Sequence, residues 1–303
     1  MKVLVCDSIS SRAVERMRQA GLEVDVDDKI TPEALLEKVE PYDAMVVRSR
    51  TKVRKPVIDC AKNLKVIVRG GVGVDNIDVA YAEARGIRIM NTPGASTQAV
   101  AELALAYIFA LARPVVQATE SMRAGMWEKS KFEGIEVAGK VLGIIGMGRI
   151  GLALAQRAAA LGMLVLGYDS RTIGAAPFMH MVDLDELLQK ADFISLHIPL
   201  TESSKHLLNT EMFAKMKVGV RIVDCARGGV IDEEALYDAI VAGKVAGAAL
   251  DVFENEPLTD RRLFELPQVI GSPHVGAGTK EATARIGDEV ADLLIGVSQE
   301  PCS

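Results

Sequence analysis

Short runs of apolar, mostly β-branched residues alternate with amphipathic segments along the chain. In the N-terminal third, strands are expected at Lys2 to Cys6, Leu22 to Val26, Ala44 to Val47 and Lys65 to Val68. The segments between them carry apolar residues at helical spacing, at Ser11 to Ala20, Pro32 to Glu40 and Lys55 to Ala61. Strands that alternate with helices in this way predict an α/β fold with a mostly parallel sheet.

A second unit of the same kind follows. The turn residues Asn91-Thr-Pro-Gly94 precede a long helical stretch from about Ser96, and they predict a domain boundary. Further strands are expected at Val141 to Ile145, Leu164 to Tyr168, Phe193 to Leu196, Arg221 to Asp224, Gly247 to Leu250 and Val269 to Ile270. Thr279 to Val297 has helical periodicity and could pack back on the first domain. We therefore predict a discontinuous domain, 1–93 plus 279–303, a second domain, 94–278, and a cleft between them that opens and closes.

Composition excludes several classes of protein. The chain has 303 residues, 49% of them apolar and 25% charged, with a net charge of −6 and no basic stripe, so no nucleic acid is expected as a partner. Asp7 comes too early for a signal peptide, and Glu102 and Arg113 interrupt the apolar stretch 100–116, so a cytoplasmic protein with no membrane partner is predicted. Four scattered cysteines, Cys6, Cys60, Cys225 and Cys302, are expected to be reduced thiols, and the histidines predict no metal site.

A glycine motif follows the first strand of the second unit. Gly146, Gly148 and Gly151 have the G-x-G-x-x-G spacing and lie between an apolar strand and a helix, the context of a dinucleotide-binding turn. Asp169 ends the next strand, where an acid accepts ribose hydroxyls and repels a 2′-phosphate, so NAD is favoured over NADP. The alternatives are a chance turn and a helix-capping aspartate, and Arg171 could instead accept a 2′-phosphate.

Three later strands each end in a chemically useful residue. Arg227, in Cys225-Ala-Arg-Gly-Gly229, can hold a carboxylate with its planar fork, although it could also be a surface arginine in a glycine turn. His274, in Ser272-Pro-His, can exchange a proton near neutral pH, although a lone histidine is usually structural. Asp251, Glu254 and Glu256 lie between them in sequence, and the residues alone leave open which of the three pairs with His274.

These motifs, in this order, resemble those of the D-2-hydroxyacid dehydrogenase family over essentially the whole length. The resemblance implies a flavodoxin-like substrate domain and a Rossmann NAD-binding domain. It implies that Arg227 holds the substrate carboxylate, that His274 is the general acid/base, and that Glu256 orients it. It also implies cofactor contacts at Gly146, Gly148, Arg149, Ile150, Gly151, Asp169, Ile198, Cys225, Ala226, Arg227, Asp251, His274, Gly276 and Ala277. Asp251 would face the nicotinamide carboxamide, and Cys225 would be a packed residue rather than a nucleophile.

The N-terminal segments 46–53 and 68–76 resemble family members that act on D-3-phosphoglycerate. Substrate contacts are therefore expected at Arg48, Ser49, Arg50, Arg69, Gly70 and Gly71, in addition to Arg227 and His274. The alternative for Arg48 to Arg50 is a solvated basic edge. Lys129 and Lys131 lie in a region that reaches a partner subunit in this family, which predicts a homodimer or higher homo-oligomer and makes both lysines candidate phosphate ligands. Val72 stands at a position where family members often have a hydroxyl residue that contacts the cofactor. The end at Ser303 predicts no serine-binding regulatory domain.

The sequence thus predicts NAD-dependent oxidation of D-3-phosphoglycerate to 3-phosphohydroxypyruvate, the entry to serine synthesis. The nearest alternative is a related dehydrogenase that acts on glyoxylate, hydroxypyruvate or another unphosphorylated acid. A further alternative from another class is an NAD-sensing binding protein, since some relatives act as transcriptional corepressors.

Overall fold

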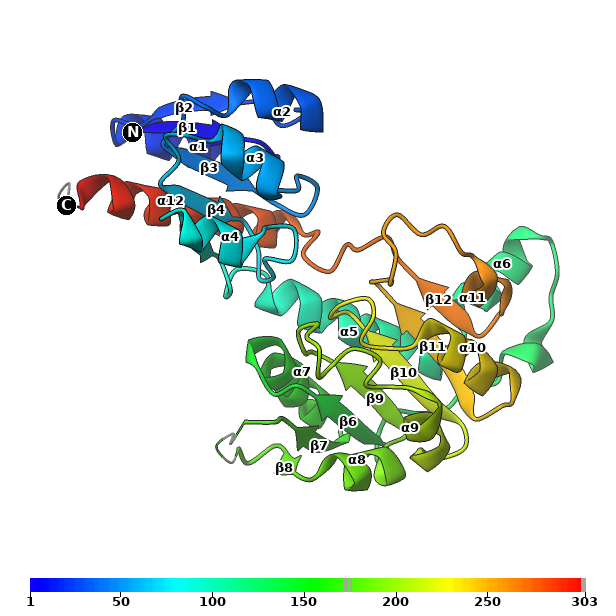
Figure 1. The fold of residues 1–303 in the computed structure, drawn as a ribbon. Coiled ribbons are helices and arrows are strands. Elements are labelled where there is room, and N and C mark those ends of the chain that lie inside the picture. The colour runs from blue at the N-terminus through cyan, green and yellow to red at the C-terminus, as the bar shows by residue number, and fades with distance from the viewer. Residues whose placement is uncertain (172–173, 175, 301–303) are drawn as a thin grey trace. The chain divides into compact units, whose positions relative to one another are not determined.

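The computed structural model describes residues 1–171, 174 and 176–300. The chain divides into two compact units (Figure 1), one formed by Met1–Thr97 with the chain from Ala277 onward, and the other by Gln98–Gly276. The boundaries predicted from sequence were 93/94 and 278/279. Each unit is built on its own sheet, and in the described chain every strand pairing is parallel.

The first unit has a five-stranded sheet in the order β2-β1-β3-β4-β5, the strand order of a flavodoxin-like fold. Its strands are β1 (Lys2–Val5), β2 (Glu23–Val26), β3 (Ala44–Val47), β4 (Val66–Arg69) and β5 (Arg88–Asn91). Its helices are α1 (Ser11–Gln19), α2 (Pro32–Lys38), α3 (Lys55–Cys60), α4 (Val79–Ala84) and α12 (Lys280–Gln299). Side-chain caps fix several starts: Ser10 caps α1, Thr31 caps α2 and Thr279 caps α12.

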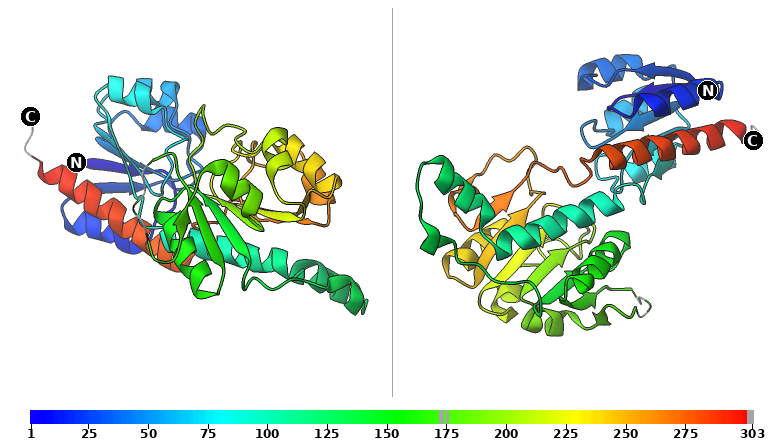
Figure 2. Two further views of the ribbon diagram at one scale, coloured as in Figure 1. Left: turned by 90° about the horizontal axis from the view of Figure 1, so that it is seen from below. Right: turned by 180° about the vertical axis from the view of Figure 1, so that it is seen from behind.

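Alternate residues of each strand pack on opposite faces of this sheet. Leu4 of β1 packs in the core beneath α2, α3 and α4, whereas Val3 and Val5 pack beneath α1 and α12. Arg16 of α1 binds Asp288 of α12 at 3.0 Å, and Figure 2 shows α12, in red, running alongside α1, in blue. The C-terminal helix therefore completes the fold of the N-terminal sheet.

The second unit has a seven-stranded sheet in the order β12-β11-β10-β9-β6-β7-β8. Its strands are β6 (Val141–Ile145), β7 (Leu164–Tyr168), β8 (His180–Met181), β9 (Phe193–Leu196), β10 (Val220–Asp224), β11 (Val245–Leu250) and β12 (Val269–Gly271). Its helices are α5 (Thr97–Ala112), α6 (Val115–Arg123), the 3-10 turn η1 (Lys129–Phe132), α7 (Arg149–Ala160), α8 (Leu184–Lys190), α9 (Thr210–Lys215), α10 (Glu233–Val241) and α11 (Arg262–Glu265). Helices α5 and α7 cover one face of the sheet, and α8 to α11 cover the other.

The order in which strands are added to this sheet reverses at β6, which lies between β7 and β9. Open parallel sheets bind ligands at such a point, beyond the carboxyl ends of the strands. The predicted fold class is confirmed, with one strand added: β8 is two residues long and pairs with β7 at Leu166 and Gly167.

Cys6, Cys60 and Cys225 have free thiols, and Cys302 lies outside the described residues. Among the described residues, no single helix has the length and apolar composition that a membrane span requires; α5 and α6 meet those two criteria only as a pair bent by 66°.

Candidate active site

The glycine motif forms the turn between β6 and α7. Gly146 has a φ of 100°, and a Cβ on Gly151 would lie 2.1 Å from the carbonyl oxygen of Gly146, so only glycine fits where α7 packs against the strand. Gly148 is the N-cap residue of α7, and a Cβ there would have no described atom within 4 Å beyond its chain neighbours. In the described chain no side chain caps this helix, so its first amide groups are available to an anion. The turn therefore fits the pyrophosphate of a dinucleotide.

Asp169 follows β7 and lies against this turn. Its carboxylate accepts hydrogen bonds from the backbone amide of Met147 at 2.9 Å and from the guanidinium of Arg171 at 3.0 and 3.1 Å. The hydrogen bond from Arg171, which outweighs the opposing effect of burial, holds the pKa of Asp169 below its usual range. The charge favours a ribose diol over a 2′-phosphate, and the ribose hydroxyls would have to replace Arg171, whose side chain is exposed.

His274 and Glu256 form a hydrogen-bonded pair on the loops after β12 and β11. His274 Nδ1 lies 2.8 Å from Glu256 Oε2, and both side chains are about one-third exposed, at 37% and 38%. Burial alone would raise the pKa of Glu256, but the hydrogen bond and charge of His274, the amide of Phe253 and the charge of Arg227 together lower it. A carboxylate that stays ionised on Nδ1 leaves Nε2 to exchange a proton with a substrate.

The turn that carries His274 is held by a buried carboxylate. Asp251, 1% exposed, accepts hydrogen bonds from the Ser272 hydroxyl at 2.5 Å, the Val275 amide at 2.8 Å and the Gly276 amide at 2.7 Å. Tyr107 of α5 lies 2.5 Å from the same hydroxyl. These contacts stabilise the turn in which His274 adopts a left-handed φ of 54°. Asp251 thus positions the histidine, and its contact with the nicotinamide stays a prediction.

Arg227 lies on a glycine turn after β10, next to the Glu256 loop. A Cβ on Gly228 would lie 1.8 Å from the carbonyl oxygen of Phe253, so the two loops touch through their backbones. Arg227 Nη1 donates to the carbonyl oxygen of Ala226 at 2.6 Å, and its charge acts on Glu256. The ends of β10, β11 and β12 therefore bring a cation, a carboxylate and an imidazole together.

The remaining residues that the family resemblance assigns to the cofactor lie on several segments. Ile198 contacts the Gly146 turn, since a Cβ on Gly146 would lie 2.6 Å from its Cγ2. Cys225 and Ala226 are buried behind Arg227, and burial raises the pKa of the Cys225 thiol, which fits a packing role. Arg149 and Ile150 begin α7, Gly276 is held by Asp251, and Ala277 is the first residue of the returning segment of the other unit.

Asp224, the last residue of β10, is a buried carboxyl that the sequence analysis did not single out. It is 2% exposed, and its Oδ1 accepts the amide of Ala226 at 2.8 Å. Burial raises its pKa to about 7, against the opposing hydrogen bond from Ala226 and charge of Arg227; nearby Asp251 raises it further. Its position at a strand end was a usable signal, but burial could not be read from sequence.

We expect Asp224→Asn to stabilise the protein more at high pH than at low pH. A carboxyl whose pKa rises from near 4 to about 7 on folding contributes stability that is complete below pH 4 and lost as pH rises through 7, up to about 4 kcal/mol. Asparagine stays neutral and can still accept the Ala226 amide. Thermal unfolding of both proteins between pH 5 and pH 8.5 should show a difference in Tm that grows with pH.

The control is Asp238→Asn, which removes an exposed carboxylate from α10. Its Tm should follow that of the wild-type protein at every pH. A constant offset between Asp224→Asn and wild type would contradict a buried carboxyl that ionises near neutral pH.

The first unit holds the residues predicted to bind the substrate phosphate. A Cβ on Gly70 would lie 3.4 Å from Arg48 Cγ, and one on Gly71 would overlap the Arg69 guanidinium, so both arginine side chains pass over the glycine backbone. Within the described chain, the Arg48 guanidinium makes one hydrogen bond, a long one of 3.4 Å from Nη1 to the carbonyl oxygen of Ser8. Ser49 is exposed. Arg48, Arg69, Gly70 and Gly71 therefore lie together at the carboxyl ends of β3 and β4.

Arg50 is placed differently from Arg48. Its guanidinium turns back onto Asp7 and onto backbone carbonyl groups of the same unit. Asp7 and Asn76, which the sequence analysis did not assign to the site, both hold this segment. Asp7 could have been suspected, because an acid directly after β1, an inner strand of the sheet, lies at the ligand-binding edge of a parallel sheet.

Comparisons with known proteins agree with this arrangement. Residues 105–276 match the family model described as D-isomer specific 2-hydroxyacid dehydrogenase, NAD binding domain. The chain is 48% identical over 298 residues to D-3-phosphoglycerate dehydrogenase of Methanocaldococcus jannaschii, covering 97% of this chain but 57% of that protein. It is also 48% identical over 297 residues to hydroxypyruvate reductase of Thermotoga maritima, covering 97% of each.

A solved structure is similar over the full length as well. The crystal structure of a glyoxylate reductase from Paecilomyes thermophila superposes with a TM-score of 0.90 at 32% identity, covering 99% of this chain and 96% of that one. The chain thus spans little more than half the length of the M. jannaschii protein, and nearly all of the T. maritima protein. NAD is the cofactor, and the chain belongs to the D-isomer specific 2-hydroxyacid dehydrogenase family.

Proposed function

We propose that this chain catalyses the NAD-dependent oxidation of D-3-phosphoglycerate to 3-phosphohydroxypyruvate. The His274–Glu256 pair beside Arg227 is the observation that supports hydride transfer coupled to proton transfer. The observation that supports a phosphorylated substrate is Arg48, a half-buried cation whose guanidinium makes a single long contact among the described residues. Entry into serine synthesis and a cytoplasmic location stay predictions of the same proposal.

In this mechanism His274 is the general base. Its Nε2 takes the proton of the C2 hydroxyl while the C2–H bond breaks and the C2–O bond becomes a carbonyl. NAD supplies the acceptor for the hydride that leaves C2. Glu256 holds the ring through Nδ1 and balances the positive charge that His274 gains. In the reverse direction the same Nε2 returns the proton to the carbonyl oxygen.

Arg227 binds the substrate carboxylate in this proposal. A guanidinium can donate two parallel hydrogen bonds to a carboxylate, which fixes the rotation of the substrate about its C1–C2 bond. The contact between Gly228 and Phe253 ties the Arg227 turn to the loop of Glu256. The residue that orients the substrate, Arg227, and the residue that orients its base, Glu256, are therefore held together by one backbone contact.

Recognition of the phosphate falls to Arg48, Ser49 and Arg69 of the first unit, with the backbone of Gly70 and Gly71. Burial lowers the pKa of the Arg48 guanidinium, which nevertheless stays charged at any working pH. A partly desolvated cation gains more from a phosphate dianion than an exposed one does. Four of the five N–H groups of Arg50 are already engaged, so it is assigned no phosphate contact.

The test is oxidation of NADH with a panel of 2-keto acids, repeated with NADPH. The value of kcat/KM for 3-phosphohydroxypyruvate should exceed the values for hydroxypyruvate and glyoxylate. Arg48→Ala should lower it by about 10- to 150-fold through KM, the loss expected for hydrogen bonds to a charged group, and should leave hydroxypyruvate nearly unaffected.

Lys52→Ala is the matched control, because it removes an exposed cation from the same segment. It should leave both substrates unaffected. A preference for hydroxypyruvate together with no effect of Arg48→Ala would overturn the phosphate assignment. Failure to oxidise NADH with any 2-keto acid would instead favour an NAD-sensing binding protein.

A reductase for unphosphorylated 2-keto acids is the second candidate. The hydroxypyruvate reductase of T. maritima covers 97% of this chain and is itself covered to 97%. The same panel separates the two, since only the phosphorylated substrate depends on Arg48.

A homodimer is part of the same proposal. Val115, Met122, Met126 and Trp127 are exposed to between 46% and 80% on α6 and the residues after it, an apolar surface of the kind that subunit contacts cover. Lys129 and Lys131 follow it and are exposed. Sedimentation equilibrium that gave the mass of a single chain would exclude the dimer.

A further inference from the structure

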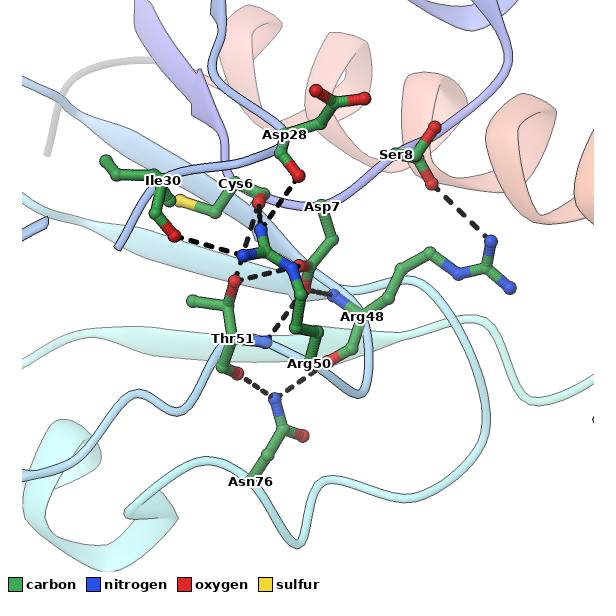
Figure 3. Close-up of polar contacts among 9 residues, drawn as sticks. All are labelled: Cys6, Asp7, Ser8, Asp28, Ile30, Arg48, Arg50, Thr51 and Asn76. Atoms are coloured by element: carbon green, nitrogen blue, oxygen red, sulfur yellow. Dashed lines mark hydrogen bonds and ion pairs between the residues drawn. The ribbon is translucent and has the colours of Figure 1, made fainter. Parts of the chain in front are cut away.

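Arg50 uses its guanidinium to join three segments of the first unit (Figure 3). Nε donates to Asp7 Oδ1 at 2.9 Å, and Nη1 donates to the carbonyl oxygen of Ile30 at 3.0 Å. Nη2 donates to the carbonyl oxygen of Asp28 at 2.9 Å and also to that of Cys6. Four of its five N–H groups are thereby engaged. A bidentate grip on a phosphate needs two, so Arg50 cannot provide one without breaking this arrangement.

Asp7 connects Arg50 to the turn that carries Arg48. Its side chain is nearly buried, and Oδ2 accepts the amide of Arg48 at 2.5 Å and the amide of Thr51 at 3.2 Å. Oδ1 accepts the Thr51 hydroxyl at 2.8 Å besides Arg50. The charge of Arg50 offsets a carboxylate that would otherwise be buried and unpaired.

Asn76 holds the same turn from the other side. Its Nδ2 donates to the carbonyl oxygens of Arg48 at 2.8 Å and of Thr51 at 2.6 Å. The backbone between these residues is thus fixed through both its amide and its carbonyl groups. Figure 3 shows the Arg48 side chain leaving this network toward Ser8, whereas the Arg50 side chain points into it.

We propose that Arg50 is a positioning residue that acts through Asp7 to hold Arg48 in place for the substrate phosphate, and that it does not contact the phosphate itself. This inference rests on the proposed function, because it assumes a phosphorylated substrate. The two arginines of the Arg48-Ser-Arg50 segment then have separate tasks: Arg48 supplies the charge and Arg50 fixes the backbone from which Arg48 projects.

A double-mutant cycle between Arg48 and Arg50 tests the assignment. Arg50→Ala should raise KM for 3-phosphohydroxypyruvate about tenfold with little change in kcat. The reason is that a displaced Arg48 guanidinium loses part of its charged hydrogen bond to the phosphate. In the Arg48→Ala background, Arg50→Ala should raise KM no further, because its effect passes through Arg48. Independent contacts with the phosphate would give multiplicative effects on KM, and that result would overturn the proposal.

Arg50→Lys keeps the charge but loses the planar guanidinium. It replaces Arg50→Ala in the test if that variant does not fold. The proposal expects Arg50→Lys to raise KM as Arg50→Ala does, because an ammonium group cannot reach Asp7 and three carbonyl groups together. A wild-type KM in Arg50→Lys would show that charge alone suffices and would overturn it. Lys52→Ala should leave KM unchanged.

Amide hydrogen exchange separates this inference from the proposed function. In Arg50→Ala, exchange at the amides of Arg48 and Thr51 should rise well above that of the wild-type protein, with or without substrate. If Arg48→Ala leaves KM for the phosphorylated acid unchanged, the proposed function fails, while faster exchange still supports the role of Arg50 in holding the turn. Wild-type exchange in Arg50→Ala would overturn that role whatever the substrate.

Discussion

Replacing His274 with alanine should lower kcat by about 10²- to 10⁴-fold, the usual contribution of a general acid/base. The His274 imidazole follows β12, and its Nδ1 lies 2.8 Å from the carboxylate of Glu256, which follows β11. Without it, the C2 hydroxyl proton has no acceptor in the oxidation, and the C2 carbonyl oxygen has no proton donor in the reverse reaction. Steady-state oxidation of NADH with the best 2-keto acid of the panel measures the loss.

The affinity for NADH should stay nearly constant in the same variant. The glycine turn and Asp169, which we expect to hold the pyrophosphate and the ribose, do not depend on His274 for their hydrogen bonds. His180→Ala is the matched control, since it removes an exposed histidine from β8. Full activity of His274→Ala would remove the residue from the mechanism, and loss of NADH binding would indicate a disturbed fold instead.

The fold was accessible from sequence because buried parallel strands are continuous apolar runs. Ala44–Val47 and Phe193–Leu196 are buried at every position, and such runs are distinct from the amphipathic helices between them. The strand β8 was missed for the opposite reason. His180–Met181 is too short for any periodicity, and only its pairing with β7 defines it as a strand.

The residues at strand ends were also accessible, but the partners of each were not. Asp251, Glu254 and Glu256 lie within six residues of one another after β11, and in an irregular loop sequence spacing does not give the direction of a side chain. In the structure Glu256 contacts His274, Asp251 holds the turn around Ser272, and Glu254 lies 3.1 Å from His206. Three neighbouring acids thus have three different partners.

Arg50 shows the same limit in the first unit. Two arginines separated by one serine look alike in sequence, and both were expected to bind phosphate. What distinguishes them is the set of carbonyl groups at Cys6, Asp28 and Ile30, which come from other parts of the chain and surround only Arg50. Such differences depend on tertiary structure and cannot be found by a local pattern.

Replacing Arg227 with alanine should lower kcat/KM by about 10²- to 10⁴-fold, the loss of two charge-assisted hydrogen bonds to a carboxylate. The loss should be similar for 3-phosphohydroxypyruvate and for hydroxypyruvate, because both substrates carry the carboxylate. This equality distinguishes Arg227 from Arg48, whose removal should affect only the phosphorylated acid. Arg227→Lys should recover part of the activity, since it restores the charge but not the planar fork.

Arg261→Ala supplies the control, because it removes an exposed arginine from the same unit. It should leave both substrates unaffected. Arg227 also adds positive charge beside Glu256, so the affinity for NADH must be measured in each variant to separate lost substrate binding from a rearranged loop. If Arg227→Ala impaired one substrate and spared the other, the arginine would contact some group other than the shared carboxylate, and the carboxylate assignment would be wrong.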